Sequence, residues 1–287
     1  MATEHTALDD LILNVRSRQQ LQQYLAQPAH ALMLTGPTGV GLGTIARTLG
    51  WQLAGPNTIY IAPTLHNKQK TTIINADDIA ELGSMVRSHR SRAVVVILDG
   101  ADQAVNGVFE RMLKLIEEPV DNVYYIFTAH SLGSIPATIL SRSALINIKL
   151  PSATDCTTLY DGLDRVTASQ VKFAADRRPA EIKRLLTNSG EFDELAKSMQ
   201  AAKEFLQGNV SKRLALIDGI ADKDAAIQLC RDVAKLVGTL AASGRMSNGM
   251  QVSRQLDLLA VTVDRLTANG NQRLQLVNLA VNFGAMV

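Results

Sequence analysis

The first half of the chain alternates short runs of apolar residues with segments in which apolar residues recur at helical spacing. The clearest run is 93–98, an unbroken apolar stretch rich in valine, as expected for a strand buried on both faces. Strands separated by helices pair in parallel through crossovers, so the pattern predicts an α/β domain with a five-stranded parallel sheet over residues 1–151. The other four strands are expected at 31–35, 58–61, 123–127 and 145–148.

Helical periodicity replaces the strand-like runs after Pro151. Residues 154–188 predict three short helices, and longer amphipathic stretches follow, such as 225–240 and 252–266. We therefore expect a small helical lid module at 152–190 and an all-α collar or oligomerisation domain at 191–287.

Composition narrows the class of protein. The 287 residues are 46% hydrophobic, which is enough for a sizeable core, and the formal net charge is only +2. With 4% aromatic residues as well, strong autonomous binding to nucleic acid is not expected. Two cysteines, Cys156 and Cys230, fit a reducing compartment, and the chain shows neither a leader-like start nor a long apolar span. These features predict a cytoplasmic protein.

A glycine-rich loop lies between the first predicted strand and a predicted helix at 44–53, a context in which backbone N–H groups can point at a phosphate. The Walker A pattern G-x-x-x-x-G-K-[ST] fits Gly36 and Gly41. It fails at Leu42, the lysine position, and at Gly43, the position of the metal-binding hydroxyl. Thr44 cannot replace that hydroxyl, because one helical residue turns a side chain by about 100°. The loop is predicted to keep the backbone shape of a phosphate-binding loop but to lack the side chains that contact the phosphates and the metal.

Two other interpretations of this loop stay open. Residues 41–46 match G-x-G-x-x-A, the dinucleotide fingerprint, although no acid for the ribose lies between Asp10 and Asp77. The glycines can also be a plain turn that joins a strand to a helix and binds no ligand.

An acidic position follows the strand at 93–98. Asp99 is placed where magnesium would be held, but Gly100 occupies the position of the acid that would orient attacking water. Asp99 can equally be a strand-end carboxylate, and Asp102 is predicted to cap the helix that follows. Without the lysine and the second acid, hydrolysis is not expected.

Four segments resemble AAA+ clamp-loader subunits of the bacterial DNA polymerase III type, most closely the delta-prime subunits. Two are specific: Leu-x-Glu-Glu-Pro within 112–119, and Pro-x-Thr-Ile-Leu-Ser-Arg within 135–143. The other two are the glycine-rich segment 30–41 and the strand with its acids at 95–102. Weaker similarity at 177–186 and 268–276 extends the resemblance to a lid and a collar.

The resemblance implies a role for one arginine. Clamp loaders are five-subunit rings that bind ATP at subunit interfaces, where a neighbour inserts an arginine from a Ser-Arg-Cys segment. That segment corresponds to Ser141-Arg142-Ser143, so Arg142 would act in trans as an arginine finger on a neighbouring subunit's nucleotide. The serine in place of the cysteine leaves the guanidinium chemistry unchanged.

Other positions depart from the family's pattern. The polar sensor falls at Ala129 or His130, and the lid arginine falls near Glu181. Together with Leu42, Gly43 and Gly100, up to five nucleotide-handling positions are lost, and one cause would explain all of them. A zinc module is not expected, because residues 40–80 contain no cysteine, and His66 is interpreted as a solvated loop residue.

We expect a catalytically silent clamp-loader subunit with no metal, cofactor or intrinsic ATPase activity in its own site. ATP and magnesium would be bound by the neighbouring subunit. The implied partners are the other subunits of a hetero-pentameric ring, with the sliding clamp and primer-template DNA met through the complex and no membrane involved. Three rival hypotheses remain: a P-loop ATPase of weak activity, a nicotinamide-dependent oxidoreductase, and an AAA-like scaffold with other partners.

Overall fold

The computed structural model describes residues 7–65, 72–88, 92–105, 107–244, 248–268 and 270–284. The chain divides into two compact units, Met1–Thr187 and Asn188–Val287. The first unit contains both the predicted α/β domain and the predicted lid, so the boundary expected between them at residue 151 stays a prediction.

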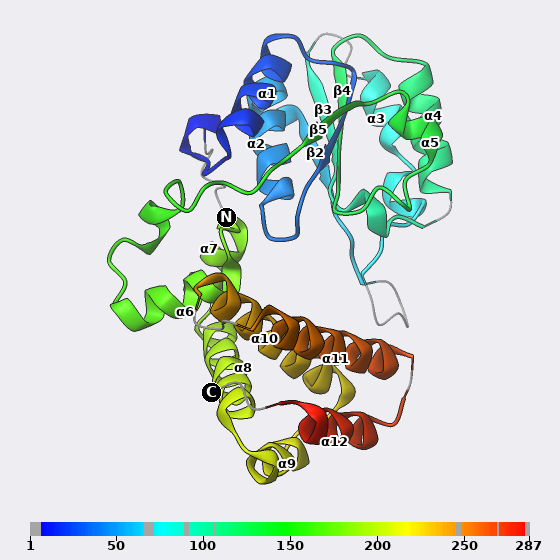
Figure 1. Ribbon diagram of the computed structural model, residues 1–287. Coiled ribbons are helices and arrows are strands. Elements are labelled where there is room, and N and C mark those ends of the chain that lie inside the picture. The colour runs from blue at the N-terminus through cyan, green and yellow to red at the C-terminus, as the bar shows by residue number, and fades with distance from the viewer. Residues whose placement is uncertain are drawn as a thin grey trace. The chain divides into compact units, whose positions relative to one another are not determined.

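A single parallel sheet forms the centre of the first unit (Figure 1). Within the described residues the sheet has five strands in the order β2-β3-β4-β1-β5, and every pairing between them is parallel. The predicted five-stranded α/β fold is therefore confirmed, with strand ends shifted by at most two residues. The strands are β1 (Ala31–Thr35), β2 (Thr58–Ile61), β3 (Val94–Leu98), β4 (Val123–Ala129) and β5 (Ala144–Asn147).

Helices cover both faces of this sheet, as Figure 1 shows. Helices α1 (Val15–Ala26) and α2 (Leu42–Ala54) pack on one face, where alternate strand residues such as Leu32 and Ile97 join their apolar cluster. The intervening residues, such as Met33 and Val96, face the opposite cluster. That second cluster is covered by α3 (Leu82–Ser88), α4 (Val108–Glu117) and α5 (Ala137–Leu140).

Short 3-10 turns connect several of these elements: η1 (Leu8–Asp10), η2 (Gly55–Asn57), η3 (Asp77–Ile79) and η4 (Ala101–Gln103). The predicted helix cap at Asp102 is wrong. Asp102 lies inside η4, and α4 begins six residues later behind Gly107, which has φ 93°. The carboxylate of Asp102 accepts the backbone N–H groups of His130 and Ser131 at 3.0 and 3.1 Å instead, so it fastens η4 to the segment after β4.

A small helical module ends the first unit. It contains η5 (Thr157–Tyr160), α6 (Arg165–Ala175) and α7 (Pro179–Thr187). Asp164 caps α6 through its side chain, which accepts from two N–H groups of the first turn. Between α6 and α7, Asp176 and Arg177 both have positive φ, 39° and 59°, a conformation that side chains other than glycine rarely adopt. The turn into α7 is therefore strained and tightly specified.

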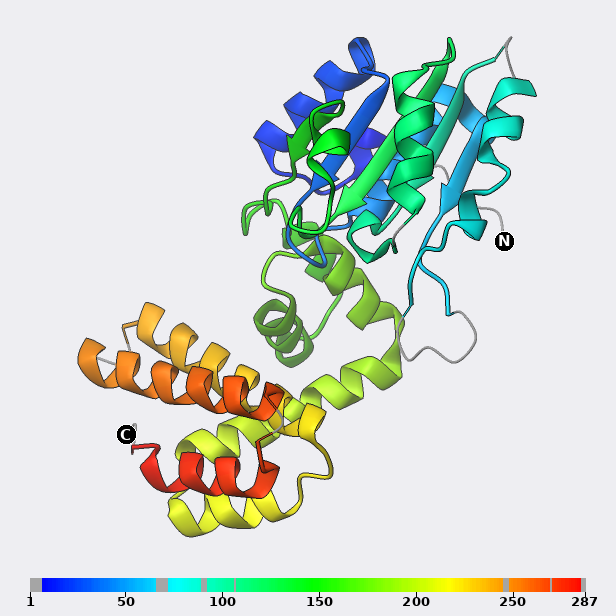
Figure 2. The same cartoon turned by 90° about the vertical axis from the view of Figure 1, so that its right-hand side faces the viewer.

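The second unit is all-helical (Figure 2). Helices α10 and α11 lie side by side, α8 packs against α10, and α12 packs against α9 and α11. Asparagine or aspartate side chains cap all five helices at their N-termini. The helices are α8 (Ser189–Gln207), α9 (Val210–Asp218), α10 (Lys223–Ala242), α11 (Gly249–Thr267) and α12 (Gln272–Asn282).

A buried arginine ties three of these helices together. Arg213 of α9 is 2% exposed and packs against the rings of Phe205 and Phe283, with its guanidinium carbon 5.3 and 5.0 Å from their centroids. Its nitrogens donate to carbonyl groups at the ends of α8 and α12, and burial lowers the pKa of the guanidinium. These bonds satisfy helix-end carbonyls that would otherwise lack partners. The accepting carbonyls belong to Phe205, Leu206, Ala280, Phe283 and Gly284.

Both cysteines are buried, and burial raises the pKa of each thiol. No helix among the described residues combines the length and the apolar character needed to cross a bilayer.

Candidate functional site

The glycine-rich loop runs from the end of β1 to the start of α2. Gly39 and Gly41 have φ 83° and 96°, in the left-handed region where glycine is strongly preferred. Gly41 is the N-cap residue of α2. The predicted strand–loop–helix arrangement of a phosphate-binding loop is therefore present in the backbone.

An open cavity of about 320 Å³ lies beside this loop. Five of the seven residues predicted for the site line it: Gly41, Leu42, Gly43, Thr44 and Asp99. Gly36 lies at the start of the loop, where its carbonyl oxygen is 2.9 Å from Nδ1 of His130. Arg142 does not line this cavity.

Leu42 occupies the lysine position with a side chain that is turned inward. It is 3% exposed and belongs to the apolar cluster between the sheet and α2. A Cβ built on Gly36 would lie 3.4 Å from Cδ2 of Leu42, so the side chain fills the space beneath the start of the loop. Thr44 is exposed and is among the residues that line the cavity.

Both oxygens of the Asp99 carboxylate are bound by the chain itself. Oδ1 accepts a hydrogen bond from Oγ1 of Thr128 at 2.5 Å, and Oδ2 accepts one from the hydroxyl of Tyr60. The hydroxyl of Thr128 accepts in turn from the backbone N–H of Gly100 at 2.8 Å. Burial, together with the hydrogen bond to Asp99, raises the pKa of Tyr60, so the phenol stays a donor.

The carboxylate of Asp99 also fills the space beside Gly43. A Cβ at residue 43 would lie 2.9 Å from Cγ and 3.0 Å from Oδ1 of Asp99, and closer still to Oδ2. Carbon atoms do not approach so closely, so no side chain fits at residue 43 while Asp99 keeps this position. The negative charge lies against the first turn of α2, where a helix N-terminus stabilises anions.

Other groups of the chain bind the carbonyls of the loop. The N–H groups of Ala180 and Glu181, in the first turn of α7, donate to the carbonyl oxygen of Gly39 at 3.0 and 3.3 Å. The side chain of Glu181, near the expected lid arginine, pairs with Arg184 at 2.7 Å. At the sensor position, Ala129 is buried and the adjacent His130 contacts the loop through Gly36.

As arranged here, these residues do not fit magnesium triphosphate. The lysine position carries a buried apolar side chain, and the acid that would hold the metal has both oxygens engaged. Among the described residues, no group of three or more histidine, cysteine or acidic side chains could hold a metal ion. His66 lies outside the described residues.

Arg142 lies two residues beyond α5, before the edge strand β5. Its side chain is part-exposed, with Nη2 3.0 Å from Oε1 of Glu117 and Nη1 3.1 Å from the carbonyl oxygen of Thr138. The neighbouring residue of β5, Leu145, is also exposed. The role of Arg142 as an arginine finger stays a prediction. The part-exposed position of Arg142 leaves its guanidinium accessible to solvent.

Sequence reasoning missed Tyr60 and Thr128 as partners of Asp99. Tyr60 lies near the end of β2, Asp99 directly follows β3, and Thr128 lies near the end of β4. Since these strands are adjacent and parallel, their carboxyl ends meet at one edge of the sheet. The order of the strands in the sheet would have identified both residues. The periodicity of the sequence does not reveal that order.

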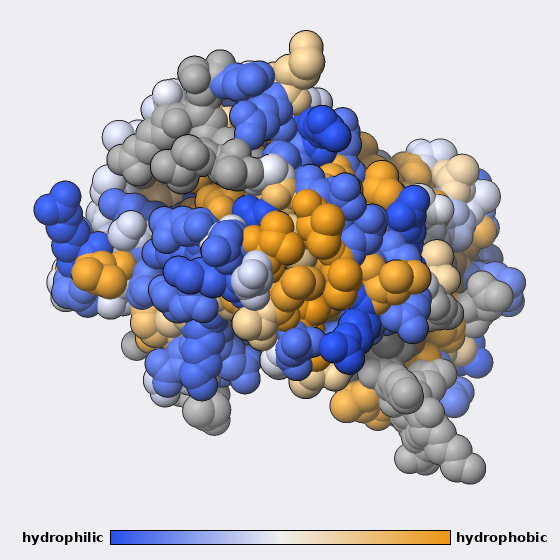
Figure 3. All heavy atoms as spheres, turned by 60° about the horizontal axis from the view of Figure 1, so that its bottom comes forward, coloured by the Kyte–Doolittle hydropathy of each residue, from blue (hydrophilic) through white to orange (hydrophobic). Residues whose placement is uncertain are grey.

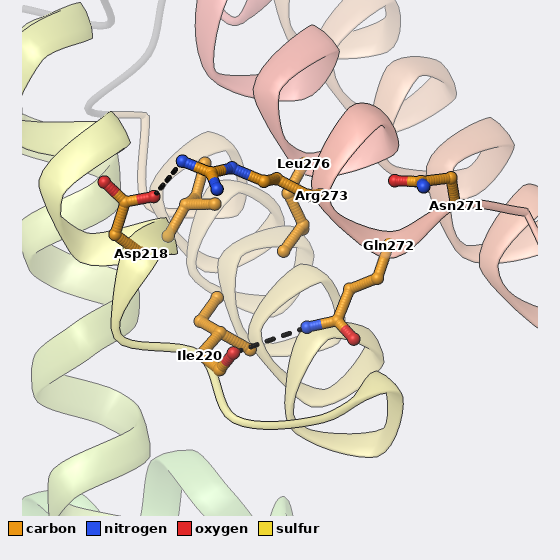
Figure 4. A pocket seen from close by; sticks show the side chains of 7 residues that line it. Asp218, Ile220, Asn271, Gln272, Arg273 and Leu276 are labelled. Carbon is orange, nitrogen blue, oxygen red and sulfur yellow. Dashed lines mark hydrogen bonds and ion pairs between the residues drawn. The ribbon is translucent and has the colours of Figure 1, made fainter.

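A second cavity, of about 370 Å³, lies within the second unit between α9 and α12. Figure 4 shows Arg273 reaching Asp218, at 3.1 Å, and Gln272 reaching the carbonyl oxygen of Ile220, at 3.4 Å. These contacts fasten α12 to α9 and bring no catalytic pair together.

On its outer side α12 exposes Leu274 and Val281, at 64% and 55%. Figure 3 shows apolar side chains gathered in the middle of one face of the molecule.

A parallel sheet with a glycine-rich loop, a helical lid and an all-α domain defines the AAA+ class of P-loop proteins. Comparison with known proteins specifies the family. Residues 14–152 match the family described as "DNA polymerase III, delta subunit". The predicted resemblance is thereby confirmed: over residues 14–152 the chain is similar to clamp-loader subunits of the DNA polymerase III type.

Two curated relatives support this assignment. The DNA polymerase III subunit delta' of Haemophilus influenzae is 32% identical over 81 residues, which cover 28% of this chain and 25% of that protein. The DNA polymerase III subunit gamma of Buchnera aphidicola is 26% identical over 141 residues, or 43% of this chain and 39% of that protein. The chain thus matches well under half the length of either relative.

A solved structure extends the likeness to nearly the whole chain. The DNA polymerase III gamma subunit-related protein of Thermotoga maritima aligns with a TM-score of 0.55 over 92% of this chain and 97% of that one. At 13% identity, this likeness shows a shared fold.

Proposed function

We propose that this chain is a catalytically silent, delta-prime-like clamp-loader subunit. In this proposal it completes a ring assembly and supplies Arg142 in trans to a neighbouring ATPase subunit during sliding-clamp loading in DNA replication. The observation that carries the proposal is the carboxylate of Asp99, which is bound on both oxygens by the chain and lies against Gly43.

The contacts of Asp99 support the proposed lack of ATP hydrolysis more strongly than the residue types at the Walker A positions do by themselves. Magnesium is normally held by a P-loop hydroxyl and an acid at the end of a neighbouring strand. Here Gly43 provides no hydroxyl, and the acid occupies the space that its side chain would need. Leu42 removes the cation that would contact the β- and γ-phosphates. Metal, phosphate and lysine contacts are therefore all lost together.

The position of Arg142 supports the trans role. An arginine finger acts on a phosphate bound by another subunit, so its guanidinium has to be accessible at a surface of its own subunit. Arg142 meets that requirement, and its contacts are one exposed ion pair and backbone or hydroxyl oxygens. Exposed ion pairs contribute little, so the pairing with Glu117 does not prevent the guanidinium from contacting a phosphate.

The second unit is proposed to act as the collar of the ring. The outer side of α12 exposes Leu274 and Val281, and Arg273 is the helix's one charged residue. Protein interfaces are depleted in charged residues at their centre, so this face suits a neighbouring subunit. With a net charge of only +2, the chain is expected to meet primer-template DNA and the sliding clamp through the assembled complex.

The test is ATP turnover by a complex reconstituted from this chain and the ATPase and remaining clamp-loader subunits of the same host. Arg142→Ala should leave assembly intact and slow turnover by about 10³–10⁵-fold, the contribution expected of a trans arginine. Arg184→Ala is the matched control, because it removes another exposed arginine that pairs with a glutamate. It should leave turnover within about twofold of the unmodified complex, as expected for an exposed surface pair.

Three outcomes would contradict the proposal in different ways. Unchanged turnover in an intact complex containing Arg142→Ala would remove the trans role. Magnesium-dependent ATP hydrolysis by the purified chain alone would favour the active P-loop ATPase. Failure to join the clamp-loader subunits would favour a scaffold with other partners.

A further inference from the structure

The two most specific sequence segments of the chain meet at one ion pair. Glu117 belongs to the Leu-x-Glu-Glu-Pro segment and is the last residue of α4, and Arg142 belongs to the Pro-x-Thr-Ile-Leu-Ser-Arg segment. Oε1 of Glu117 lies 3.0 Å from Nη2 of Arg142. The side chains are 44% and 42% exposed, so both charges remain at the surface.

A second set of contacts fixes the other side of the same guanidinium. Nη1 of Arg142 donates to the carbonyl oxygen of Thr138 at 3.1 Å, and Oγ of Ser141 lies 3.4 Å from the same nitrogen. A guanidinium carries five N–H groups in a planar fork. Contacts with the described residues engage only the two Nη atoms, so the Nε–H group and one Nη–H group remain to donate elsewhere.

Both anchors stand on well-packed elements. Ile116, which precedes Glu117, and Ile139, which follows Thr138, are buried in the same apolar cluster beneath α4 and α5. The backbone segments that carry the Glu117 side chain and the Thr138 carbonyl are therefore anchored to the same core.

We propose that Glu117 is a positioning residue for Arg142, an inference that rests on the proposed function. A free arginine side chain would lose much of its rotamer freedom when it engages a neighbour's phosphates. Glu117 and Thr138 hold the planar fork in one orientation before assembly, so less freedom is lost when the neighbour docks. Because the ion pair is exposed and screened, it orients the guanidinium without keeping it from a phosphate.

The experiment measures kcat and KM for ATP in the reconstituted complex with four variants of this chain. Glu117→Ala should lower kcat by about two- to fivefold, the worth of an exposed ion pair, with KM for ATP unchanged. Glu117→Gln should restore most of kcat, since its amide oxygen still accepts from Nη2. Glu118→Ala is the matched control, because it removes the adjacent exposed acid and should leave kcat unchanged. Arg142→Ala gives the reference for complete loss of the finger.

The proposal predicts that Glu117→Ala adds no further loss in the Arg142→Ala background. Wild-type kcat for Glu117→Ala, or an equal loss for Glu118→Ala, would overturn the proposal while leaving the finger in place. A rise in kcat for both Glu117→Ala and Glu117→Gln would also overturn it, because the glutamate would then shield the arginine. Wild-type turnover with Arg142→Ala would overturn the proposed function itself. If Glu117→Ala fails to assemble, Glu117→Asp, which withdraws the carboxylate by one methylene, takes its place with the same expected loss.

Discussion

Two regions of the first unit, the glycine-rich loop and the surroundings of Arg142, differ in how far their polar groups are hydrogen-bonded within the chain. Around the glycine-rich loop, polar groups are hydrogen-bonded by other residues of the same chain. The carboxylate of Asp99 accepts from Tyr60 and Thr128, and the carbonyl oxygen of Gly39 accepts from N–H groups of α7. At the start of β5, by contrast, Arg142 is held by a single exposed carboxylate and local oxygens, and its guanidinium remains accessible.

Under the proposed function, the contrast explains how an AAA+ subunit could lose its own nucleotide site and still contribute an arginine to a neighbour's site. A polar group that is paired inside the chain stabilises the fold, and binding a ligand would compete with the hydrogen bonds it already makes. A polar group held by weak exposed contacts contributes little stability and can exchange partners. The proposed function, in which the subunit acts through its neighbour, predicts both inward pairing at the loop and an accessible guanidinium at Arg142.

Arg213 is a buried arginine whose guanidinium is bound inside the chain, so it can be compared with the exposed Arg142. Its replacement has the largest effect that we expect on stability. Arg213→Met should destabilise the second unit by about 3–5 kcal/mol, because it leaves buried helix-end carbonyls without donors. Arg142→Met should cost less than about 1 kcal/mol, since it removes an exposed ion pair. Chemical denaturation and hydrogen exchange of the full chain measure both, with the exposed Arg231→Met as a control. Equal losses for Arg142 and Arg213 would show that Arg142 has a structural role.

The sequence predicted the sheet well because its strands are short apolar runs with a strong local signal. The limits of β1 and β2 match the predicted ranges, since the loop glycines and the Gly-Pro-Asn turn mark the strand boundaries. Five of the seven predicted site residues meet at one cavity for the same reason: they follow strands that end at one edge of the sheet.

The remaining contacts of the site depend on tertiary arrangement. That Asp102 binds backbone N–H groups after β4, rather than capping a helix, follows from the neighbouring positions of β3 and β4. The ion pair between Glu117 and Arg142 joins residues 25 positions apart through the packing of α4 against α5. No local pattern encodes either contact, although both lie within recognisable sequence motifs.

Restoring the missing lysine gives the next largest effect. Leu42→Lys should destabilise the first unit by about 2–5 kcal/mol, because it removes a buried apolar side chain and brings an ammonium group into the same cluster. Thr44→Lys, which adds the same charge at an exposed position of the same helix turn, should change stability by about 0.5 kcal/mol or less. Denaturation of both variants measures the difference. A Leu42→Lys chain as stable as Thr44→Lys would show that the space under the loop still accepts a lysine.

The smallest expected effect tests the contact between Asp99 and Gly43, on which the silent-site argument depends. Gly43→Ala should destabilise the chain by about 1–3 kcal/mol, because its Cβ overlaps the Asp99 carboxylate. In an Asp99→Ala background the same substitution should be neutral or stabilising, by up to about 1 kcal/mol, since alanine favours a helix over glycine. The sign of the change therefore depends on Asp99, which is the signature of a direct contact.

Gly190→Ala is a matched control for this cycle, because Gly190 is likewise the second residue of a helix, α8, and its Cβ would meet only Asn188 Oδ1, at an ordinary 3.5 Å. It should be neutral or stabilising in both backgrounds. If Gly43→Ala behaved like Gly190→Ala in the presence of Asp99, the carboxylate would be free to leave the first turn of α2. The two regions of the first unit would then differ only in their residue types, and the loop would still have room for a metal-bound phosphate.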